Sequence, residues 1–479
     1  MKAKKALAIT LSAALAGLVS LSLCGCDWFS SGAGGAGSVD GGKKNPYEVA
    51  TDLGYGGNVG EWLSGAVSPD SEARRMYEEA REDGYEGTFL DFLKELNWST
   101  STDDSPSIAQ AVTSAVSITS EFTVYNTSTR RTESATYAGA GVVYSLDKNS
   151  WDAYIVTNYH VVYDVKSTGK EEVEHISDNI LVYLYGGENA AEAMAATYVG
   201  GAMDYDIAVL FIDGDKTVNI VDSTGTRFSH ANGDVLKKSS VRAISAADSD
   251  AVSVGQRVYA IGNPKGEGMS VTSGVVSVDA EYIDIKSSDD KKNLSLLEIR
   301  IDAAINHGNS GGGLFDKDGK LVGIVNARSE ETGVTAFGYA IPANLALSIA
   351  QNIIDNAASG SRGALRATLG VTVMTADSYS VYDATAQKTH IMETVTVQGV
   401  QAGAAASALK AGDVFYSIKV TSQSGVERVN KVITRRHQIY SILFNTRLGD
   451  TLEIMVSRGD ELVTETVVYS ESSQFTLFD

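Results

Sequence analysis

The segment Ile305–Ala327 reads "INHGNSGGGLFDKDGKLVGIVNA", a glycine-rich loop around Ser310 that is followed by an apolar, strand-like run. A glycine-rich loop is most often a mobile turn. The alternative is that backbone N–H groups in this loop must lie close to a reacting atom. Larger side chains would obstruct that approach. This second interpretation requires a base, an orienting acid and a substrate-binding surface elsewhere in the chain.

Short apolar or alternating runs, separated by turn residues, continue on both sides of this segment from about Ile108 to Ile354. They are "AGAGVVYSL", "AYIVTNYHVV", "ILVYLYGG", "DIAVLFI", "QRVYAIGNP", "SVTSGVVSV", "LVGIVNA" and "FGYAIP". Such spacing predicts a mainly β fold, either a sandwich or a barrel. The run "NLALSIAQNIIDNAASG" then predicts an amphipathic helix that closes this part, and a further unit follows from about Ala364.

A histidine, an aspartate and the loop serine form a candidate catalytic set. His160 lies at the end of "YIVTNYHVV", Asp206 begins "DIAVLFI", and Ser310 lies in "GNSGGG". Each is weak evidence alone, because a histidine or an aspartate at a strand end is more often structural. Their order along the chain is that of the trypsin-like two-barrel proteases, in which they are base, orienting acid and nucleophile. Asp204 is an alternative acid, and His307 is an alternative base that the loop should direct away from Ser310.

Five motifs in this part of the chain resemble the HtrA/DegP family of serine proteases: "TNYHVV", "DIAVL", "GNPKGEGMSVTSGVVS", "DAAINHGNSGGGLFDKDGKLVGI" and "GYAIP". The resemblance covers about residues 108–479 and favours Asp206 over Asp204 as the orienting acid. It implies a two-barrel, trypsin-like protease domain with a C-terminal PDZ domain. It also implies a serine endopeptidase that acts on unfolded or misfolded proteins, and a homotrimer.

The resemblance assigns further roles around the nucleophile. The oxyanion hole is expected to be formed by the backbone of Gly308, Asn309 and Ser310. The strand expected to pair with the substrate backbone ends in Ile324, Val325, Asn326 and Ala327. Because this run holds no acid, we expect an apolar specificity pocket and cleavage after small or medium aliphatic residues.

Three departures from the family pattern are present. The family usually has proline at the positions of His307 and Gly313. We expect Gly313 to loosen the segment after the nucleophile, and we hypothesise that His307 makes the order of the oxyanion loop depend on pH. The chain also has extra length between Asp213 and Val241, which we interpret as a surface insertion.

The last unit resembles a PDZ domain of the HtrA type. It contains "LGVTVM", "AGAAASALKAGD", which matches a helix-and-turn segment of PDZ domains, and "RLGDTLEIMVSRGDELVTETVVY". In this module a C-terminal peptide adds to an edge strand while backbone N–H groups hold its carboxylate. That strand is expected near Leu369, Gly370 and Val371. The alternative is a packing domain without a ligand.

The N-terminus carries a basic patch and then a largely apolar run from Ala6 to Leu23, a composition typical of a secretory signal. The sequence "LCGC" that ends this run resembles a bacterial lipobox, so Cys26 is expected to be lipidated and to become the first mature residue. An uncleaved transmembrane anchor is the alternative. Both predict a body tethered to the cell membrane on its extracytoplasmic face.

Similar segments that start at Tyr47 and Tyr77 form a 30-residue repeat of short helices, which we interpret as a spacer or, alternatively, a recognition module. The predicted organisation is then a lipoprotein signal peptide (1–25), a Gly/Ser-rich tether (26–45), two helical repeats (46–98), a linker (99–107), a protease domain (108–357) and a PDZ domain (362–479).

Composition narrows the class of partner. The 479 residues carry a formal net charge of −21, which argues against nucleic acid, whose phosphates need a basic face. The two cysteines are Cys24 and Cys26, so no disulfide framework is expected in the body of the protein. No His/Cys/acid cluster has ligand spacing, and we expect no metal and no organic cofactor.

The sequence therefore predicts a membrane-anchored serine endopeptidase that cleaves unfolded proteins and binds C-terminal peptides at its PDZ groove. One alternative is a catalytically idle chaperone or peptide-binding surface protein. Another is an adhesion or scaffold protein that uses the repeats.

Overall fold

The computed structural model describes residue 81 and residues 104–479, except 127, 169–172, 188, 223, 327–336 and 384–387. The chain divides into two compact units, residues 1–104 and 105–479. The predicted signal peptide, Cys26, the tether and, apart from Arg81, the repeats lie outside the described residues. None of the helices in the described ranges has the length and apolarity needed to cross a membrane.

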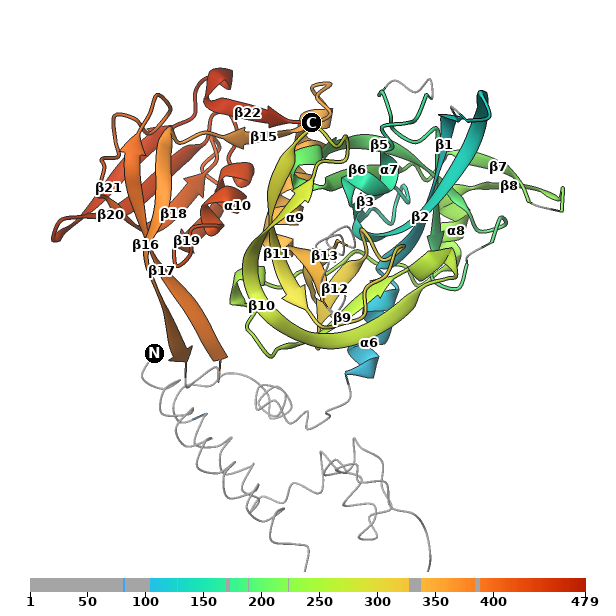
Figure 1. Cartoon of the computed structure of the whole chain (residues 1–479), viewed down its shortest axis with the longest axis horizontal. Coiled ribbons are helices and arrows are strands. Elements are labelled where there is room, and N and C mark those ends of the chain that lie inside the picture. The colour runs from blue at the N-terminus through green and yellow to red at the C-terminus, as the bar shows by residue number, and fades with distance from the viewer. Residues whose placement is uncertain are drawn as a thin grey trace, which may run out of the picture. The chain divides into compact units, whose positions relative to one another are not determined.

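Two closed six-stranded barrels confirm the predicted mainly β, two-barrel architecture (Figure 1). The first barrel has the strand order β1-β2-β3-β6-β5-β4, with all neighbours antiparallel. Its core is apolar and includes Ile118, Ile155, Met194 and Leu210. The strands are β1 Ala115–Asn126, β2 Arg131–Leu146, β3 Ala153–Thr157, β4 Asn179–Leu184, β5 Met194–Ala202 and β6 Ile207–Ile212.

The second barrel repeats this construction with the order β10-β11-β14-β13-β12-β9. Its core includes Val258, Ile299, Leu314 and Val325. A strand that is buried on both faces has an apolar residue at nearly every position. Strand β13, with the sequence "LVGIV", is an example. The strands are β9 Arg257–Gly262, β10 Ser270–Lys286, β11 Asn293–Ile301, β12 Gly313–Asp316, β13 Leu321–Val325 and β14 Gly338–Pro342.

Two helices pack where the barrels meet. Helix α9, Ala343–Ala357, confirms the helix predicted after the last barrel strand. Helix α6, Ser105–Val112, begins inside the segment predicted as a linker. It is helical because its apolar face, with Ile108, Ala111 and Val112, is buried in the cluster that also contains α9 residues.

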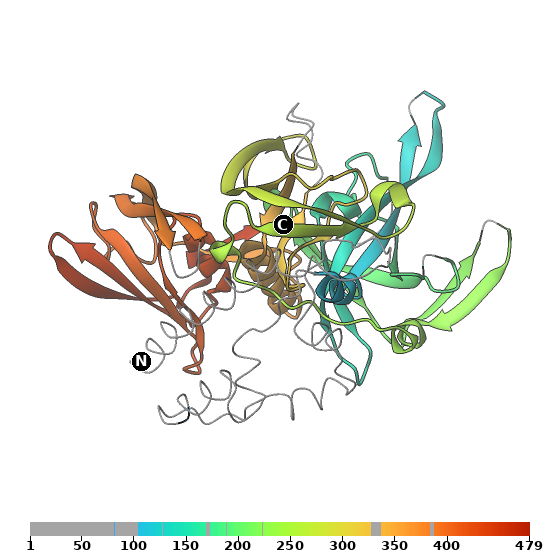
Figure 2. The ribbon, with the colours of Figure 1, turned by 90° about the horizontal axis from the view of Figure 1, so that it is seen from below.

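The extra length between Asp213 and Val241 forms a hairpin and a short helix. The hairpin joins β7, Thr217–Val221, to β8, Arg227–Ala231, and Figure 2 shows it extending from the first barrel. Helix α8, Asn232–Lys238, is part of the barrel, since Val235 and Leu236 are buried in its core. Only the hairpin therefore has the character of a surface insertion.

The C-terminal part is a separate sheet with its own apolar core, which includes Phe415, Ile442 and Ile454. The strand order is β16-β17-β18-β20-β21, with β19 paired to β18, and β16 and β17 form a long hairpin (Figure 1). Residues 402–413 form turns rather than the predicted helix and turn. The elements are β15 Ala364–Ala367, β16 Val371–Asp383, β17 Lys388–Val400, β18 Val414–Thr421, β19 Glu427–Val432, α10 Gln438–Asn445, β20 Thr451–Arg458, β21 Glu461–Val468 and β22 Phe475–Phe478.

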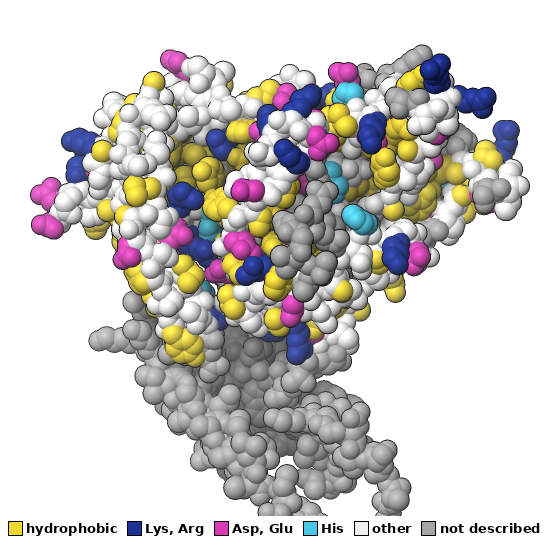
Figure 3. Space-filling view, in the orientation of Figure 1, with side chains coloured by type: hydrophobic (Ala, Val, Ile, Leu, Met, Phe, Trp, Pro, Cys, Tyr) yellow, Lys and Arg dark blue, Asp and Glu magenta, His cyan; other side chains and the backbone are white. Residues whose placement is uncertain are grey.

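Acidic and basic side chains are interspersed, with apolar ones between them, over the face seen in Figure 3. The exposed apolar side chains include Tyr379 and Tyr382 of the long hairpin. This face lacks the continuous basic area, among its described residues, that phosphate backbones require.

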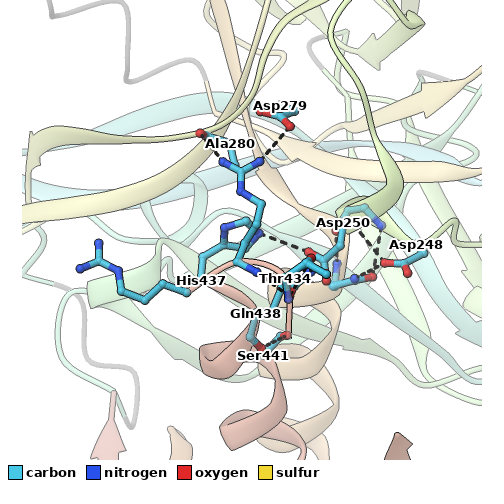
Figure 4. Close-up of polar contacts among 12 residues, drawn as sticks. Asp248, Asp250, Asp279, Ala280, Thr434, His437, Gln438 and Ser441 are labelled. Atoms are coloured by element: carbon cyan, nitrogen blue, oxygen red, sulfur yellow. Dashed lines mark hydrogen bonds and ion pairs between the residues drawn. The ribbon is translucent and has the colours of Figure 1, made fainter. Parts of the chain in front are cut away.

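A polar cluster joins the C-terminal part to the second barrel (Figure 4). Asp250 is 8% exposed and is paired with Lys431 and with His437, whose Nε2 lies 3.4 Å from Asp250 Oδ1. Arg435 Nη1 donates to Asp279 Oδ2 at 2.8 Å. Burial raises the pKa of Asp250, but the hydrogen bond from His437 and the charge of Lys431 outweigh it and hold that pKa at about 2.

Replacing Asp250 with asparagine is expected to lower the free energy of unfolding by about 2 kcal/mol near neutral pH. The folded-state pKa is lower than the unfolded one, so the stabilisation is present above about pH 4 and disappears as the pH falls to about 2. Urea unfolding of both proteins, followed by circular dichroism across this range, measures the difference. A difference that stayed constant from pH 6 to pH 2 would contradict the assignment.

Candidate active site

His160 and Asp206 are brought into direct contact at one end of the first barrel. His160 lies in the short helix α7, Tyr159–Val162, just after β3 ends at Thr157. Its Nδ1 is 2.8 Å from Asp206 Oδ2, and its backbone N–H donates to Oδ1 at 3.0 Å. Because the Asp206 carboxylate is 1% exposed and accepts both contacts, it fixes the orientation of the imidazole.

The backbone of Asp206 is held as firmly as its side chain. Asp206 has a φ of 53°, in the left-handed region, where an aspartate is tolerated but uncommon. Its carbonyl accepts hydrogen bonds from the Tyr159 backbone N–H at 3.1 Å and from Asn158 Nδ2 at 2.9 Å. Asn158 and Tyr159 therefore hold the backbone of Asp206 in this conformation, while His160 contacts its side chain.

The two alternative residues are placed elsewhere. Asp204 pairs with Lys292, whose Nζ lies 3.0 Å from Asp204 Oδ1. His307 is exposed, and its backbone carbonyl accepts the Lys265 N–H at 2.8 Å. Neither contact is with His160 or Asp206.

The Ser310 loop belongs to the second barrel but is seated on the first. The Ser310 carbonyl accepts the Ala140 N–H from β2 at 2.8 Å. Gly311 has a φ of 81°, and a Cβ there would lie 2.1 Å from Thr157 Oγ1 and 2.3 Å from the Ala140 carbonyl oxygen. Only glycine fits such an approach, which places the serine beside the strand end that leads to His160.

The loop before the serine presents two backbone N–H groups. Gly308 has a φ of 97°, and a Cβ there would meet the Asn263 carbonyl oxygen at 2.1 Å. The Gly308 and Ser310 N–H groups donate to no described residue, as an oxyanion hole requires. The Asn309 N–H instead donates to the Asn306 carbonyl at 3.0 Å, so the expectation that Asn309 contributes is wrong.

Gly313 does not loosen the segment after the serine. It is the first residue of β12 and pairs with Ile261 on one side and Ile324 on the other. A Cβ at this position would lie 2.4 Å from the ring of Phe315. The glycine therefore permits close packing in the barrel.

Comparison with known proteins agrees with this architecture. Residues 139–324 match the family described as the trypsin-like peptidase domain. The chain is 28% identical over 346 residues to the serine protease Do-like HtrA of Lactococcus lactis subsp. cremoris (strain MG1363), covering 70% of this chain and 71% of the relative. It is 29% identical over 342 residues to the periplasmic serine endoprotease DegP of Escherichia coli (strain K12), covering 70% and 57% of the two chains.

The chain is a homologue of the HtrA/DegP serine proteases. It is a serine endopeptidase with a trypsin-like peptidase domain. Among solved structures, it is similar to the HtrA-type protease AlgW with decapeptide, at 24% identity, a TM-score of 0.43, and coverage of 78% of this chain and 99% of that one.

In this HtrA/DegP homologue, two of the residues expected to pair with substrate are unavailable. Ile324 and Val325 are fully buried and pair with β14, and Ile324 also pairs with Gly313 of β12. The Val325 N–H donates to the Gly312 carbonyl, and its own carbonyl accepts the Gly311 N–H. The prediction is wrong for both residues, because their backbone is already bonded within the barrel. Asn326 follows this ladder, and Ala327 lies outside the described residues.

A buried acid that the sequence reading missed lies behind Asn326. Glu298 of β11 is fully buried, and its Oε1 accepts a hydrogen bond from Asn326 Nδ2 at 2.9 Å. The run Ile324–Ala327 itself holds no acid, so the expectation of an apolar specificity pocket stays a prediction. The signal was present in the run "LSLLEIRI", where a glutamate interrupts residues otherwise suited to a buried strand.

The HtrA/DegP homologue also has a groove at the predicted peptide-binding residues. A cavity of about 230 Å³ lies between β16 and α10. The N–H groups of Leu369 and Gly370 donate to no described residue, and β16, which begins at Val371, is an edge strand. The cavity is lined, among others, by Arg366, Leu369, Gly370, Val371, Arg436, Ile439, Tyr440 and Leu443.

Within the described ranges, no group of three or more His, Cys, Asp or Glu side chains is arranged to hold a metal ion.

Proposed function

We propose that the protein is a membrane-anchored, extracytoplasmic endopeptidase that cleaves unfolded or misfolded proteins and captures C-terminal peptides in a PDZ groove. The observation that carries the catalytic part is the double contact of Asp206 with His160, through the ring and through the backbone N–H. A helix-capping role alone would explain the contact with the backbone N–H but not the contact with the imidazole ring.

The proposed reaction proceeds through an acyl-enzyme. His160 removes the proton of Ser310 as Oγ attacks the scissile carbonyl carbon, and Asp206 stabilises the imidazolium that forms. The N–H groups of Gly308 and Ser310 bind the oxyanion. The imidazolium then protonates the leaving amine, and a water molecule, deprotonated by His160, releases the acyl group from the serine.

The proposed capture of C-terminal peptides is supported by the geometry of the groove. An incoming strand has the free edge of β16 to pair with, and the Leu369 and Gly370 N–H groups remain to receive a carboxylate. Arg366 and Arg436 line the same cavity and favour a negative charge there.

The proposed location is supported by the sequence of the N-terminus and by one relative. The basic patch, the apolar run and the motif before Cys26 are typical of a lipoprotein signal. The Escherichia coli relative is named a periplasmic protease. Lipidation of Cys26 and the homotrimer implied by family resemblance stay predictions.

The substrate class is tested by offering the full-length protein one substrate in two states, native α-lactalbumin and the same protein reduced and carboxymethylated. The unfolded form is expected to be cleaved at least about a hundredfold faster, since an extended peptide must enter the site and a native chain opens rarely. Labelling of Ser310 by a fluorophosphonate, in parallel, reports whether the catalytic groups are competent. A labelled enzyme that cleaved both forms equally would contradict the proposed substrate class, and an enzyme that was neither labelled nor active would contradict the proposed mechanism.

A further inference from the structure

Glu298 is a fully buried acid that the mechanism does not use. Glu298 lies in β11 between Leu297 and Ile299, which are buried as well. One of its carboxyl oxygens, Oε1, accepts the Asn326 side-chain N–H at 2.9 Å, and the other, Oε2, is buried without a hydrogen-bond partner among the described residues. A leucine would fill this space without that cost, so packing alone does not account for a glutamate here.

Burial disfavours the ionised form of the Glu298 carboxyl group. Burial raises the pKa of Glu298 well above its ordinary value; the hydrogen bond from Asn326 lowers it, and the charges of Asp206 and Glu281 raise it further. Glu281 lies opposite Glu298 in the β10–β11 pair and is itself paired with Arg300 at 3.2 Å. In the neutral form that burial favours, Glu298 can still accept the hydrogen bond from Asn326.

Asn326 connects Glu298 to the strand end beside the nucleophile loop. Its backbone N–H donates to the Tyr339 carbonyl at 2.9 Å, and it directly follows Val325. Val325 is bonded to the nucleophile loop in both directions, donating to Gly312 at 2.8 Å and accepting from Gly311 at 2.9 Å. The end of β13 is thus connected to the residues just after Ser310.

We propose that Glu298 is a positioning residue of the protease, whose carboxyl group holds the Asn326 amide and so fixes the end of β13 beside the nucleophile loop. This inference rests on the proposed function, because the position of that strand end matters for catalysis only if a peptide is bound next to it. Glu298 itself touches neither the substrate nor the reacting atoms.

The test compares Glu298→Leu with Glu298→Gln in the full-length protein. The leucine variant is expected to lower kcat/KM for fluorescein-labelled casein about tenfold, mainly through KM, because the hydrogen bond between Asn326 and residue 298 is lost. Labelling of Ser310 by a small fluorophosphonate is expected to change by less than about twofold, since that reagent does not use the strand end. Glu298→Gln keeps an acceptor oxygen for Asn326, so its kcat/KM is expected to be close to that of the wild type. Leu296→Ala, two residues earlier on the same strand, is the matched control that should lower the melting temperature without raising KM.

Asn326→Ala removes the donor from the other side and is expected to raise KM as much as Glu298→Leu. The double variant should be no worse than either single one, because both substitutions break the same contact. If the Glu298→Leu variant does not fold, Asn326→Ala tests the same contact in its place. A wild-type KM in Glu298→Leu or Asn326→Ala, or an equal loss with leucine and glutamine, would overturn the inference. A wild-type protein that is neither labelled nor active points instead to failure of the proposed function.

Discussion

Ser310→Ala is expected to lower kcat for casein cleavage by about 10⁶-fold, the largest effect of any single substitution in this protein. The variant keeps the Gly308 and Ser310 backbone N–H groups, and with them oxyanion binding, but no hydroxyl remains to form the acyl-enzyme. His160 and Asp206 then have no proton to move, so their contact no longer contributes to the rate. Release of fluorescent fragments over hours, with enzyme in large excess, measures the residual activity.

Ser359→Ala is the matched control, since Ser359 is an exposed serine at the end of α9. It is expected to have wild-type activity. Both variants should unfold at the temperature of the parent protein. If Ser310→Ala retained more than about one per cent of wild-type kcat, another group would have to be the nucleophile.

Asp206→Asn is expected to lower kcat by about 10⁴-fold. The carboxylate now accepts from both the backbone N–H and Nδ1 of His160, at 3.0 and 2.8 Å. An asparagine that presents its NH2 group to Nδ1 fixes the opposite tautomer, in which Nε2 carries the proton and does not act as a base toward Ser310. Steady-state kinetics at constant pH measure the loss, which should be in kcat with little change in KM.

Asp204→Asn provides the control for this second prediction. Asp204 lies two residues away and pairs with Lys292 near the surface, so its replacement is expected to change kcat by about twofold at most. Equal losses in the two variants would mean that the Asp206 contact with His160 is not what orients the base.

Much of the fold could be predicted from local pattern. Runs such as "DIAVLFI" and "LVGIVNA" predicted β6 and β13 because strands buried on both faces must be apolar throughout. Helix α6 was missed because eight residues beside a polar linker carry little periodicity, and tertiary burial of Ile108 and Val112 decides their conformation. The same reasoning accounts for α8, whose apolar pair is short but fully buried.

The candidate site was predictable where chemistry restricts the residue type and not where it depends on strand pairing. The chemistry restricts the base, the orienting acid and the nucleophile to a few residue types, which His160, Asp206 and Ser310 match. By contrast, only the register of β13 against its neighbours reveals that the backbone of Ile324 and Val325 is already bonded. The partner of Glu298 was invisible for the same reason, because Asn326 is 28 residues away in the chain.

The seating of Gly311 against Thr157 and Ala140 has a consequence for how loss of activity should be diagnosed. One barrel supplies the imidazole and its acid, and the other supplies the alcohol. A displacement of one against the other by about an ångström would leave every strand ladder intact and lower turnover by about a hundredfold. Circular dichroism of the backbone would then be unchanged. Damage where the two barrels meet would be detected by measuring activity.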